Sequence, residues 1–196
     1  MSAVVVILVA YVAGSIPTGV LLGRAAGIDV RREGSGNIGA TNVARTAGRT
    51  LGILTLIGDA LKGLLPVLLA RALGLDEAAV AAVAVATLCG HVFSMFLRLR
   101  GGKGVATGVG ALLGLAPASL PIPLVIFAAT IAVTRIVSLA SILAVLLAPL
   151  AVFFFRYPPP ATAAAIAMAL LILYRHRENM SRLLAGTERR FESKKA

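Results

Sequence analysis

The residues best suited to chemistry form a glycine-rich loop at 34–42, followed closely by an arginine. Glycines let a backbone adopt positive φ angles and approach a ligand closely. Short polar side chains add hydrogen-bond donors and acceptors, and a guanidinium group presents a fixed fork of donors that matches phosphate oxygens. The loop is therefore a candidate anion site, unless it is a plain turn-rich connector. Its candidate residues are Gly34, Ser35, Gly36, Asn37, Gly39, Thr41, Asn42 and Arg45.

A second basic loop lies at 98–104 and combines three cations with three glycines. It resembles a nucleotide-binding P-loop only superficially. Leu97 stands where that pattern needs a glycine, and Gly104 stands where it needs serine or threonine. We therefore expect a phosphate clamp rather than a nucleotide site. Its candidate residues are Arg100, Gly101, Gly102, Lys103 and Gly104.

Two ionisable residues, Asp59 and Lys62, interrupt an apolar stretch at 50–73. Their spacing of three places them on one face of a helix, where they can pair. Ionisable groups inside a membrane segment are functional candidates by default. The alternative is a structural ion pair that orients the helix. His91 lies near the end of the next apolar stretch, at 78–97.

Two further polar sets have helical spacing near the ends of apolar stretches. The first is Arg135, Ser138 and Ser141, and the second is His176, Asn179 and Arg182. Each set would line one helix face. Taken singly, each is typical of a junction where polar residues meet lipid head groups. Together with the two basic loops, they indicate several clusters of phosphate-type donors.

The composition is that of a membrane protein. The chain has 196 residues, of which 59% are hydrophobic, and a mean hydropathy of +0.95. Apolar runs of about 20 residues recur, which is the length that spans a bilayer. We expect one polytopic membrane domain and interpret the first stretch as a retained helix rather than a signal peptide. Cys89 is the only cysteine, so neither a disulfide framework nor a cysteine metal cluster is expected.

Charge distribution predicts the topology. The apolar stretches are 3–22, with a kink near Pro17 and Gly19, then 50–73, 78–97, 105–133, 136–155 and 161–174. Prolines at 117, 121 and 123 favour two short helices within 105–133. Sixteen of the nineteen Lys and Arg residues, including Lys194 and Lys195, then lie on one side, as the positive-inside rule requires. The sequence thus predicts an all-α fold of seven transmembrane helices, with the amino terminus outside and the carboxyl terminus cytosolic.

The net charge of +11 fits this positive-inside bias and an anionic ligand better than nucleic acid. Four segments then resemble a known family. They are GSGNIGATNVAR at 34–45, DALKG at 59–63, the stretch from GHVFSMF to RGGKGVAT at 90–107, and HRENMSRLLAGTE at 176–188. They look like the acyl-phosphate:glycerol-3-phosphate acyltransferases, the PlsY family. The resemblance covers nearly the whole chain.

The resemblance implies an enzyme of the bacterial inner membrane with its active site facing the cytoplasm. Such an enzyme transfers an acyl group from acyl phosphate to the 1-hydroxyl of sn-glycerol 3-phosphate and releases lysophosphatidic acid. It also implies catalytic roles for Ser35, Arg45, Lys103, His176 and Asn179. The expected substrate-binding residues are those of the two loops together with Asp59, Lys62, His91, Thr107, Ser138, Ser141, Arg182 and Glu188.

The chain departs from the family pattern at three positions. Ser94 stands where proline is usual, and Leu99-Arg100 stands where phenylalanine-lysine is usual. A cation is kept at position 100, so the departures concern local loop shape. Because acyl phosphate is already an activated mixed anhydride, no cofactor, thiolate or metal is expected.

Two other classes of protein compete with the acyltransferase. A small anion transporter would suit the positive loops and the intramembrane Asp59 and Lys62. Such transporters usually contain internal repeats and a site at mid-membrane, and the sequence contains no visible repeat. A purely structural membrane protein would leave the glycine-rich basic loops unexplained. The sequence predicts no oligomeric state.

Overall fold

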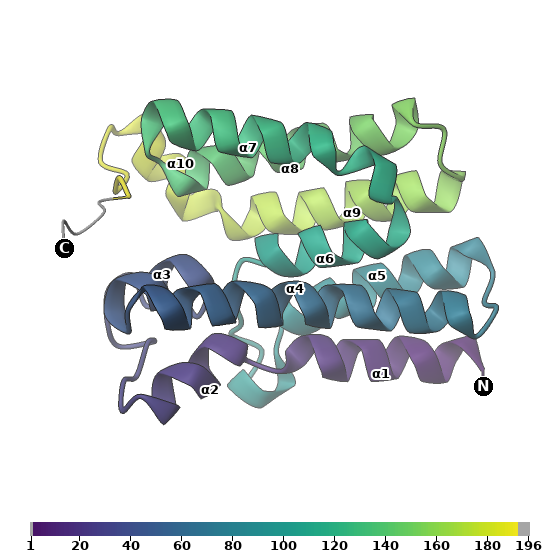
Figure 1. The fold of residues 1–196 in the computed structure, drawn as a ribbon, viewed down its shortest axis with the longest axis horizontal. Coiled ribbons are helices and arrows are strands. Elements are labelled where there is room, and N and C mark those ends of the chain that lie inside the picture. The colour runs from purple at the N-terminus through teal and green to yellow at the C-terminus, as the bar shows by residue number, and fades with distance from the viewer. Residues whose placement is uncertain (1, 192–196) are drawn as a thin grey trace. The chain divides into compact units, whose positions relative to one another are not determined.

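A computed structural model describes residues 2–191 (Figure 1). The regular structure of these residues is entirely helical. The chain folds as two compact units, unit 1 from Met1–Pro117 and unit 2 from Ala118–Ala196. Lys194 and Lys195, which the predicted charge distribution includes, lie outside the described residues.

Unit 1 is built from six α-helices and one short 3-10 helix. They are α1 (Ala3–Ser15), α2 (Thr18–Ala25), α3 (Ala40–Thr46), α4 (Arg49–Ala72), α5 (Glu77–Val92), η1 (Met95–Leu97) and α6 (Val105–Leu115). Helix α1 packs along α5, and α4 packs along α6. Figure 1 shows α2 and α3 beside the first half of α4.

Glycines set the distance between the main helices of unit 1. A Cβ atom built at Gly110 of α6 would lie 1.9 Å from the carbonyl oxygen of Ala60 in α4. A Cβ atom at Gly14 of α1 would lie 2.0 Å from the carbonyl oxygen of Thr87 in α5. These helices touch through their backbones, as small residues allow in membrane proteins. Such close packing fixes the positions of the polar groups that the helices carry.

The predicted kink near Pro17 is confirmed as a break between α1 and α2. Helix α1 ends at Ser15 and α2 begins at Thr18. Proline has no N–H group to donate to the helix. Because helix α1 ends there, the carbonyl oxygens of Ser15 and Ile16 are not used by α1 and accept hydrogen bonds from side chains far away in the sequence.

Residues 105–133 form two helices, as the prolines predict. Helix α6 ends at Leu115, η2 covers Pro117–Ser119, and α7 runs over Pro121–Thr134. The 11 residues of α6 span only about 17 Å, at about 1.5 Å per residue. This length is shorter than the roughly 30 Å hydrocarbon core of a bilayer.

Five helical segments within residues 2–191 are long and apolar enough to cross a membrane. They are Ala3–Ala25, Arg49–Ala72, Glu77–Leu97, Pro117–Thr134 and Val137–Phe154. Val105–Leu115 and Pro159–Arg175 are apolar but shorter. The protein is thus a helical integral membrane protein, and seven crossings remain a prediction.

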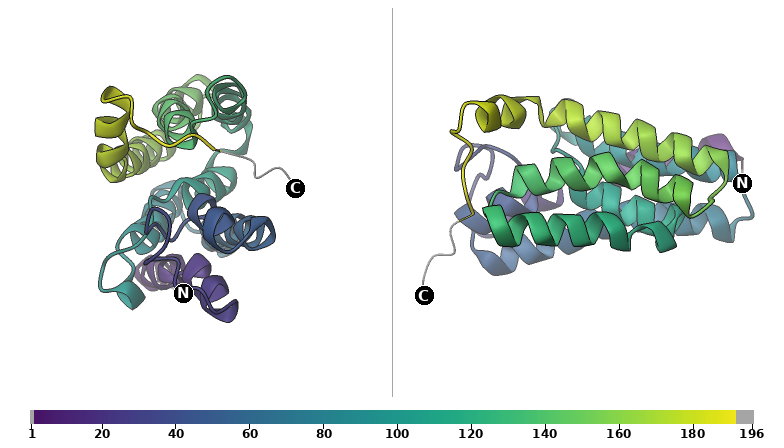
Figure 2. Two further views of the ribbon diagram at one scale, coloured as in Figure 1. Left: turned by 90° about the vertical axis from the view of Figure 1, so that its left-hand side faces the viewer. Right: turned by 90° about the horizontal axis from the view of Figure 1, so that it is seen from above.

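Unit 2 consists mainly of α7, α8 (Val137–Phe154), α9 (Pro159–Arg175) and α10 (Arg177–Leu184). Helix α8 packs against both α7 and α9, and Figure 2 shows these three running side by side. Helix α10 follows α9 after a single residue, His176, which ends one helix and begins the next.

The structure corrects three details of the expected elements. Residues 40–46 form helix α3, although glycine and asparagine around them suggested only a loop. Helix α5 ends at Val92, five residues before the predicted end, because the chain turns into η1. Arg135 does not lie on α8; it joins α7 to α8 with a φ of 59°. It therefore cannot share a helix face with Ser138.

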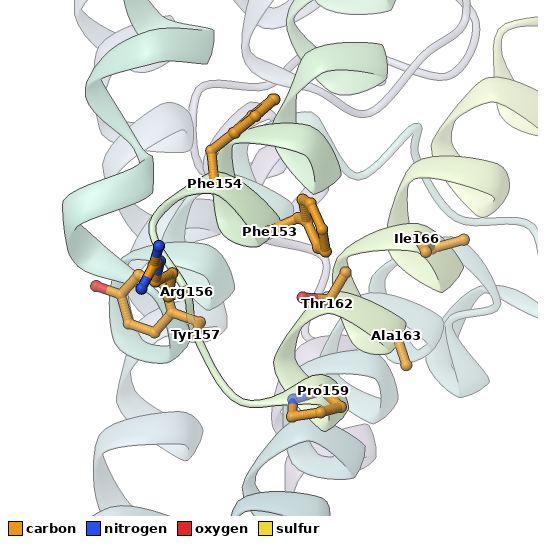
Figure 3. Close-up of a pocket in the computed structure, with 8 residues that line it drawn as sticks. All are labelled: Phe153, Phe154, Arg156, Tyr157, Pro159, Thr162, Ala163 and Ile166. Carbon is orange, nitrogen blue, oxygen red and sulfur yellow. The ribbon is translucent and has the colours of Figure 1, made fainter.

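Figure 3 shows a hollow at the turn between α8 and α9, with a volume of about 760 Å³. Phe153, Thr162 and Ile166 lie on one side of the turn in this view, and Arg156 and Tyr157 lie on the other. The hollow contains none of the predicted site residues.

Candidate active site

Asn42 organises the first glycine-rich loop. Its side-chain Oδ1 accepts hydrogen bonds from the backbone N–H of Ser35 at 2.8 Å and from the Ser35 hydroxyl at 3.1 Å. Its Nδ2 donates to the carbonyl oxygens of Val30 and Glu33. The Asn42 side chain is buried and fully used by these bonds. Its geometry is that of a residue that shapes the loop.

The loop is less open to an anion than its composition indicates. The N–H of Ser35 is bonded to Asn42, that of Gly36 to the Glu33 carbonyl, and that of Gly39 to the Asn37 side chain. Gly34 has a φ of 62°, and a Cβ atom there would lie 2.3 Å from Asn42 Oδ1. The glycine is thus required for the turn itself.

An apolar cluster joins the first loop to the second. Ile38 of the first loop and Leu97 of η1 are buried in one cluster with Val20, Val30 and Val43. A Cβ atom at Gly102 would lie 3.2 Å from the Ile38 side chain. Ile38 and Gly102 are 64 residues apart in the sequence, so two distant glycine-rich basic loops meet in unit 1.

The second loop is fixed to the end of α5. The N–H of Gly101 donates to the carbonyl of Val92 at 3.0 Å, and that of Gly102 donates to the carbonyl of His91 at 3.2 Å. A Cβ atom at Gly101 would lie 1.9 Å from the His91 carbonyl oxygen, so only glycine fits there. Lys103 is half-buried, whereas Arg100 is exposed.

Asp59 and Lys62 form the predicted ion pair, with 2.8 Å between Oδ1 and Nζ. The Lys62 ammonium also donates to the carbonyl oxygen of Ile16 at 2.7 Å, at the break between α1 and α2. His91 Nδ1 lies 3.8 Å from the same Asp59 oxygen. All three side chains are buried. The pair therefore connects α4 to the α1–α2 break and lies beside the helix that holds the second loop.

Arg45 and Thr107 occupy opposite environments. Arg45 lies on α3 and is exposed, and no ion pair to it is present among residues 2–191. Thr107 of α6 is fully buried, and its hydroxyl has no hydrogen-bond partner within those residues. Arg45 therefore suits a soluble anion, whereas Thr107 contributes to the packing of α6 on α4.

In unit 2, Glu188 gathers three of the predicted residues. Its carboxylate accepts hydrogen bonds from the Ser138 hydroxyl at 2.7 Å, the Asn179 amide at 2.5 Å and the Arg182 guanidinium at 2.7 Å. Partial burial alone would raise the pKa of Glu188. The three donors outweigh burial and hold the pKa below its ordinary value of 4.5. Glu188 is therefore an acceptor that holds α8 and α10 together.

His176 lies at the α9–α10 junction and is buried. Its Nδ1 is 2.8 Å from the carbonyl oxygen of Ile172. A carbonyl only accepts, so Nδ1 carries the hydrogen, and in the neutral ring Nε2 is the acceptor nitrogen. The ring is thus held in the tautomer that a hydroxyl donor requires. The Ser141 hydroxyl donates to the Val137 carbonyl within α8.

The structure brings some of the predicted residues into contact within each unit. In unit 1 these are Ser35 with Asn42, and Asp59 with Lys62 and His91. In unit 2 they are Ser138, Asn179 and Arg182 with Glu188. No group of three or more His, Cys, Asp or Glu side chains within residues 2–191 is arranged to hold a metal ion. Three further residues fix the second loop: Tyr11, Ser15 and Ser94. Nothing in the sequence indicated Tyr11 or Ser15, and Ser94 was marked only as a departure from the family pattern. Their contacts span about 80 residues of sequence, and hydroxyl groups in apolar stretches carry no local signal.

The helices and clusters define a class: a helical integral membrane protein with basic, glycine-rich loops suited to anions. A family model described as glycerol-3-phosphate acyltransferase matches residues 4–186. The chain belongs to the glycerol-3-phosphate acyltransferase family.

Similar proteins support the assignment. A glycerol-3-phosphate acyltransferase of Trichlorobacter lovleyi is 54% identical over 94% of this chain and 95% of its own length. One of Geobacter sulfurreducens is 52% identical, with the same coverage. A crystal structure of PlsY (YgiH), an integral membrane glycerol 3-phosphate acyltransferase in its glycerol 3-phosphate form, has a TM-score of 0.94. It is 39% identical, over 98% of this chain and 96% of that chain. The lysophosphatidic acid form has a TM-score of 0.92.

Proposed function

We propose that the protein transfers an acyl group from acyl phosphate to the 1-hydroxyl of sn-glycerol 3-phosphate. The products are lysophosphatidic acid and inorganic phosphate. The observation that carries the proposal is the meeting of two basic glycine-rich loops in unit 1 of a family member. Both substrates carry phosphate, and such loops supply the cations and N–H groups that phosphate needs.

In unit 1, Arg45 and Lys103 are the proposed phosphate-binding cations. Arg45 is exposed on α3 and offers a fork of donors. Lys103 follows two glycines whose N–H groups are tied to the end of α5. Asn42 shapes the loop that carries Ser35, and the Asp59–Lys62 pair supports the helices beneath it. We assign positioning roles to Asn42, Asp59 and Lys62. Binding roles are assigned to Arg100 and to the loop residues Asn37 and Thr41.

In unit 2, His176 and Asn179 are proposed to act on the acceptor. In this tautomer of His176, Nε2 is the ring nitrogen that can accept a hydrogen bond from the hydroxyl of the acceptor substrate. Asn179 and Arg182 are oriented by Glu188, which also binds Ser138 of α8. Glu188 thus determines where the donors of α10 point.

The proposed chemistry is direct attack. The 1-hydroxyl oxygen of glycerol 3-phosphate bonds to the acyl carbonyl carbon, and the bond from that carbon to the phosphate oxygen breaks. The hydroxyl proton passes to the leaving phosphate or to His176, and preorganised cations stabilise the negative charge that develops. Ser35 is the alternative nucleophile, but its hydroxyl donates to Asn42 rather than to a histidine.

We also propose that the protein lies in the bacterial inner membrane with both loops at the cytosolic side. The seven crossings would be α1 with α2, then α4, α5, α6, α7, α8 and α9. The positive-inside rule supports this arrangement, since Arg71 and Arg156 alone would lie near outside turns. Arg71 donates to the carbonyls of Gly114 and Leu115 at the end of α6.

The identity of the acyl donor tests the proposed reaction. Purified protein in lipid nanodiscs should form lysophosphatidic acid from palmitoyl phosphate and labelled glycerol 3-phosphate, with one phosphate released for each product. A palmitoyl thioester should give no product. Product from the thioester but none from the acyl phosphate would overturn the proposed donor while keeping the family assignment. For variants that remove the charge of Arg45 or Lys103, the matched control is Arg31→Gln, a change at an exposed arginine paired with Asp29.

A further inference from the structure

We propose that Ser94 is a positioning residue whose hydrogen bond to Ser15 fixes the basic loop and so places Lys103. We call this contact the Ser15–Ser94 clasp. Its consequence for substrate rests on the proposed function, in which Lys103 binds phosphate, whereas its effect on the loop does not. Ser94 precedes the loop at 98–104, and the glycines and cations of that loop do not by themselves predict a serine at position 94.

The clasp joins two segments that are 79 residues apart in the sequence. The Ser94 hydroxyl donates to the Ser15 carbonyl oxygen at 2.6 Å. The N–H of Met95 lies 3.5 Å from the Ser15 hydroxyl, and the Tyr11 hydroxyl donates to the Phe93 carbonyl at 2.7 Å. Ser94 is 1% exposed. A buried hydroxyl between apolar helices persists at little cost only when it is bonded.

The break between α1 and α2 makes the clasp possible. Within a continuous helix, the Ser15 carbonyl would accept the N–H of residue 19. Helix α1 instead ends at Ser15, and Pro17 prevents its continuation. The break also provides the Ile16 carbonyl that accepts from Lys62. One interruption of α1 therefore anchors both the buried ion pair and the basic loop.

Ser94 is also the pivot of the turn that follows. Its carbonyl oxygen accepts the N–H groups of Leu97 at 3.1 Å and of Leu99 at 2.9 Å. Arg98 and Leu99 have φ values of 52° and 62°. Positive φ is uncommon and unfavourable for residues other than glycine. A turn with two such residues needs an anchor to hold it, and the clasp supplies one.

The turn leads directly to Gly101, Gly102 and Lys103. The N–H groups of the two glycines are bonded at the end of α5, so the clasp and these two bonds hold the loop at both ends. Loss of the clasp would let the turn relax toward negative φ. We therefore expect the Lys103 ammonium to sample more positions and to bind phosphate less well.

The test compares Ser94→Ala with Ser94→Thr and Ser94→Pro. Alanine removes the hydroxyl, and threonine keeps it. Proline also removes the hydroxyl, but its ring fixes φ near −65°, close to the −60° that Ser94 adopts, and so keeps the start of the turn in place. Proline has no N–H group, and the Ser94 N–H donates no hydrogen bond within residues 2–191. We expect Ser94→Ala to raise the Michaelis constant for one or both phosphate substrates about 3- to 10-fold, the effect of one lost hydrogen bond. Threonine and proline should stay near the unmutated value.

The matched control is Thr87→Ala in α5, the helix that precedes Ser94. Thr87 is fully buried and bonds only to Val83 within α5. It should lose thermal stability without a change in either Michaelis constant. A Ser94→Ala variant with unchanged Michaelis constants, or with the same change as Thr87→Ala, would refute the positioning role. Tyr11→Phe gives a second variant that loosens the same segment, and we expect a smaller rise in the same Michaelis constant.

Amide hydrogen exchange tests the clasp without reference to activity. In Ser94→Ala, the amides of residues 97–102 should exchange about 3- to 10-fold faster, while those of α5 before residue 90 stay unchanged. This result would hold even if the protein used a different acyl donor. Unchanged exchange at 97–102 would refute the clasp itself.

Discussion

We propose that Arg45 and Lys103, which lie on or beside glycine-rich loops, bind phosphate in unit 1. The sequence predicts both positions because cations near glycine-rich loops have a recognisable pattern, and their role in phosphate binding stays a prediction. Asn42 was predicted as a ligand contact, but its side chain makes four hydrogen bonds, two to Ser35 of the loop and two to the carbonyls of Val30 and Glu33 before it. A sequence pattern identifies a polar residue; only packing decides whether it faces a ligand or the loop.

We expect Lys103→Ala to lower kcat/KM by about 10- to 200-fold, because a charge-assisted hydrogen bond contributes about 1.5–3 kcal/mol. Thermal stability should change little, since the side chain lies in a loop. Arg45→Ala should behave in the same way, and Arg45→Lys should recover only part of the activity if the contact uses two donors. Wild-type kinetics in Lys103→Ala would exclude it as a phosphate contact.

His176→Gln distinguishes the two proton acceptors. If the leaving phosphate takes the proton, this variant should keep measurable activity with little change in its pH profile, and we expect this result. The structural reason is that His176 is fixed by Ile172 and suited to orienting the hydroxyl. A loss of about 100-fold or more, together with loss of the acidic limb of the pH profile, would assign the general base to His176.

At the scale of elements, the sequence predicted most helices because apolar runs and prolines mark them. It also predicted the Asp59–Lys62 pair, since that contact is local. It missed helix α3, which is seven residues long and begins at Ala40 after Gly39, a residue that provides no side-chain cap. It also placed Arg135 on a helix face, because spacing alone does not reveal that the residue adopts a φ of 59° in a turn.

Glu188 links two elements of unit 2, and its removal should loosen them. Glu188→Ala leaves the Ser138, Asn179 and Arg182 donors without their acceptor, which costs about 1–3 kcal/mol per buried group. Thermal unfolding should shift to lower temperature, and kcat should fall because α10 carries Asn179. Glu178→Ala, a change at an exposed carboxylate of the same helix, is the control. Equal melting temperatures for both variants would contradict the linking role.

The same carboxylate predicts a pH dependence. The pKa of Glu188 in the folded protein is lowered from 4.5. A lowered pKa contributes stability that is fully present above the unfolded value and is lost as the pH falls through the folded value. Wild-type protein should therefore lose more stability than Glu188→Gln when the pH falls below 4.5. Parallel stability curves for the two proteins would contradict this assignment.

The topology of the whole chain is predicted from the distribution of its Lys and Arg residues rather than from any local contact. The test uses the single substitutions Asp76→Cys and Arg190→Cys in a Cys89→Ala background. Asp76 lies in the turn between α4 and α5, and Arg190 lies beyond α10. We predict that an impermeant thiol reagent applied to intact cells labels position 76 but labels position 190 only after the membrane is opened. Labelling of both from the same side would refute seven crossings.

We propose above all that the acyl group passes directly from acyl phosphate to glycerol 3-phosphate. The most direct measurement mixes purified enzyme with carbonyl-labelled palmitoyl phosphate, with and without acceptor, and quenches the mixture in acid within one turnover. We predict that label appears in lysophosphatidic acid only when glycerol 3-phosphate is present, and that the protein carries none. Stoichiometric label on Ser35 that is discharged by added glycerol 3-phosphate would contradict direct transfer.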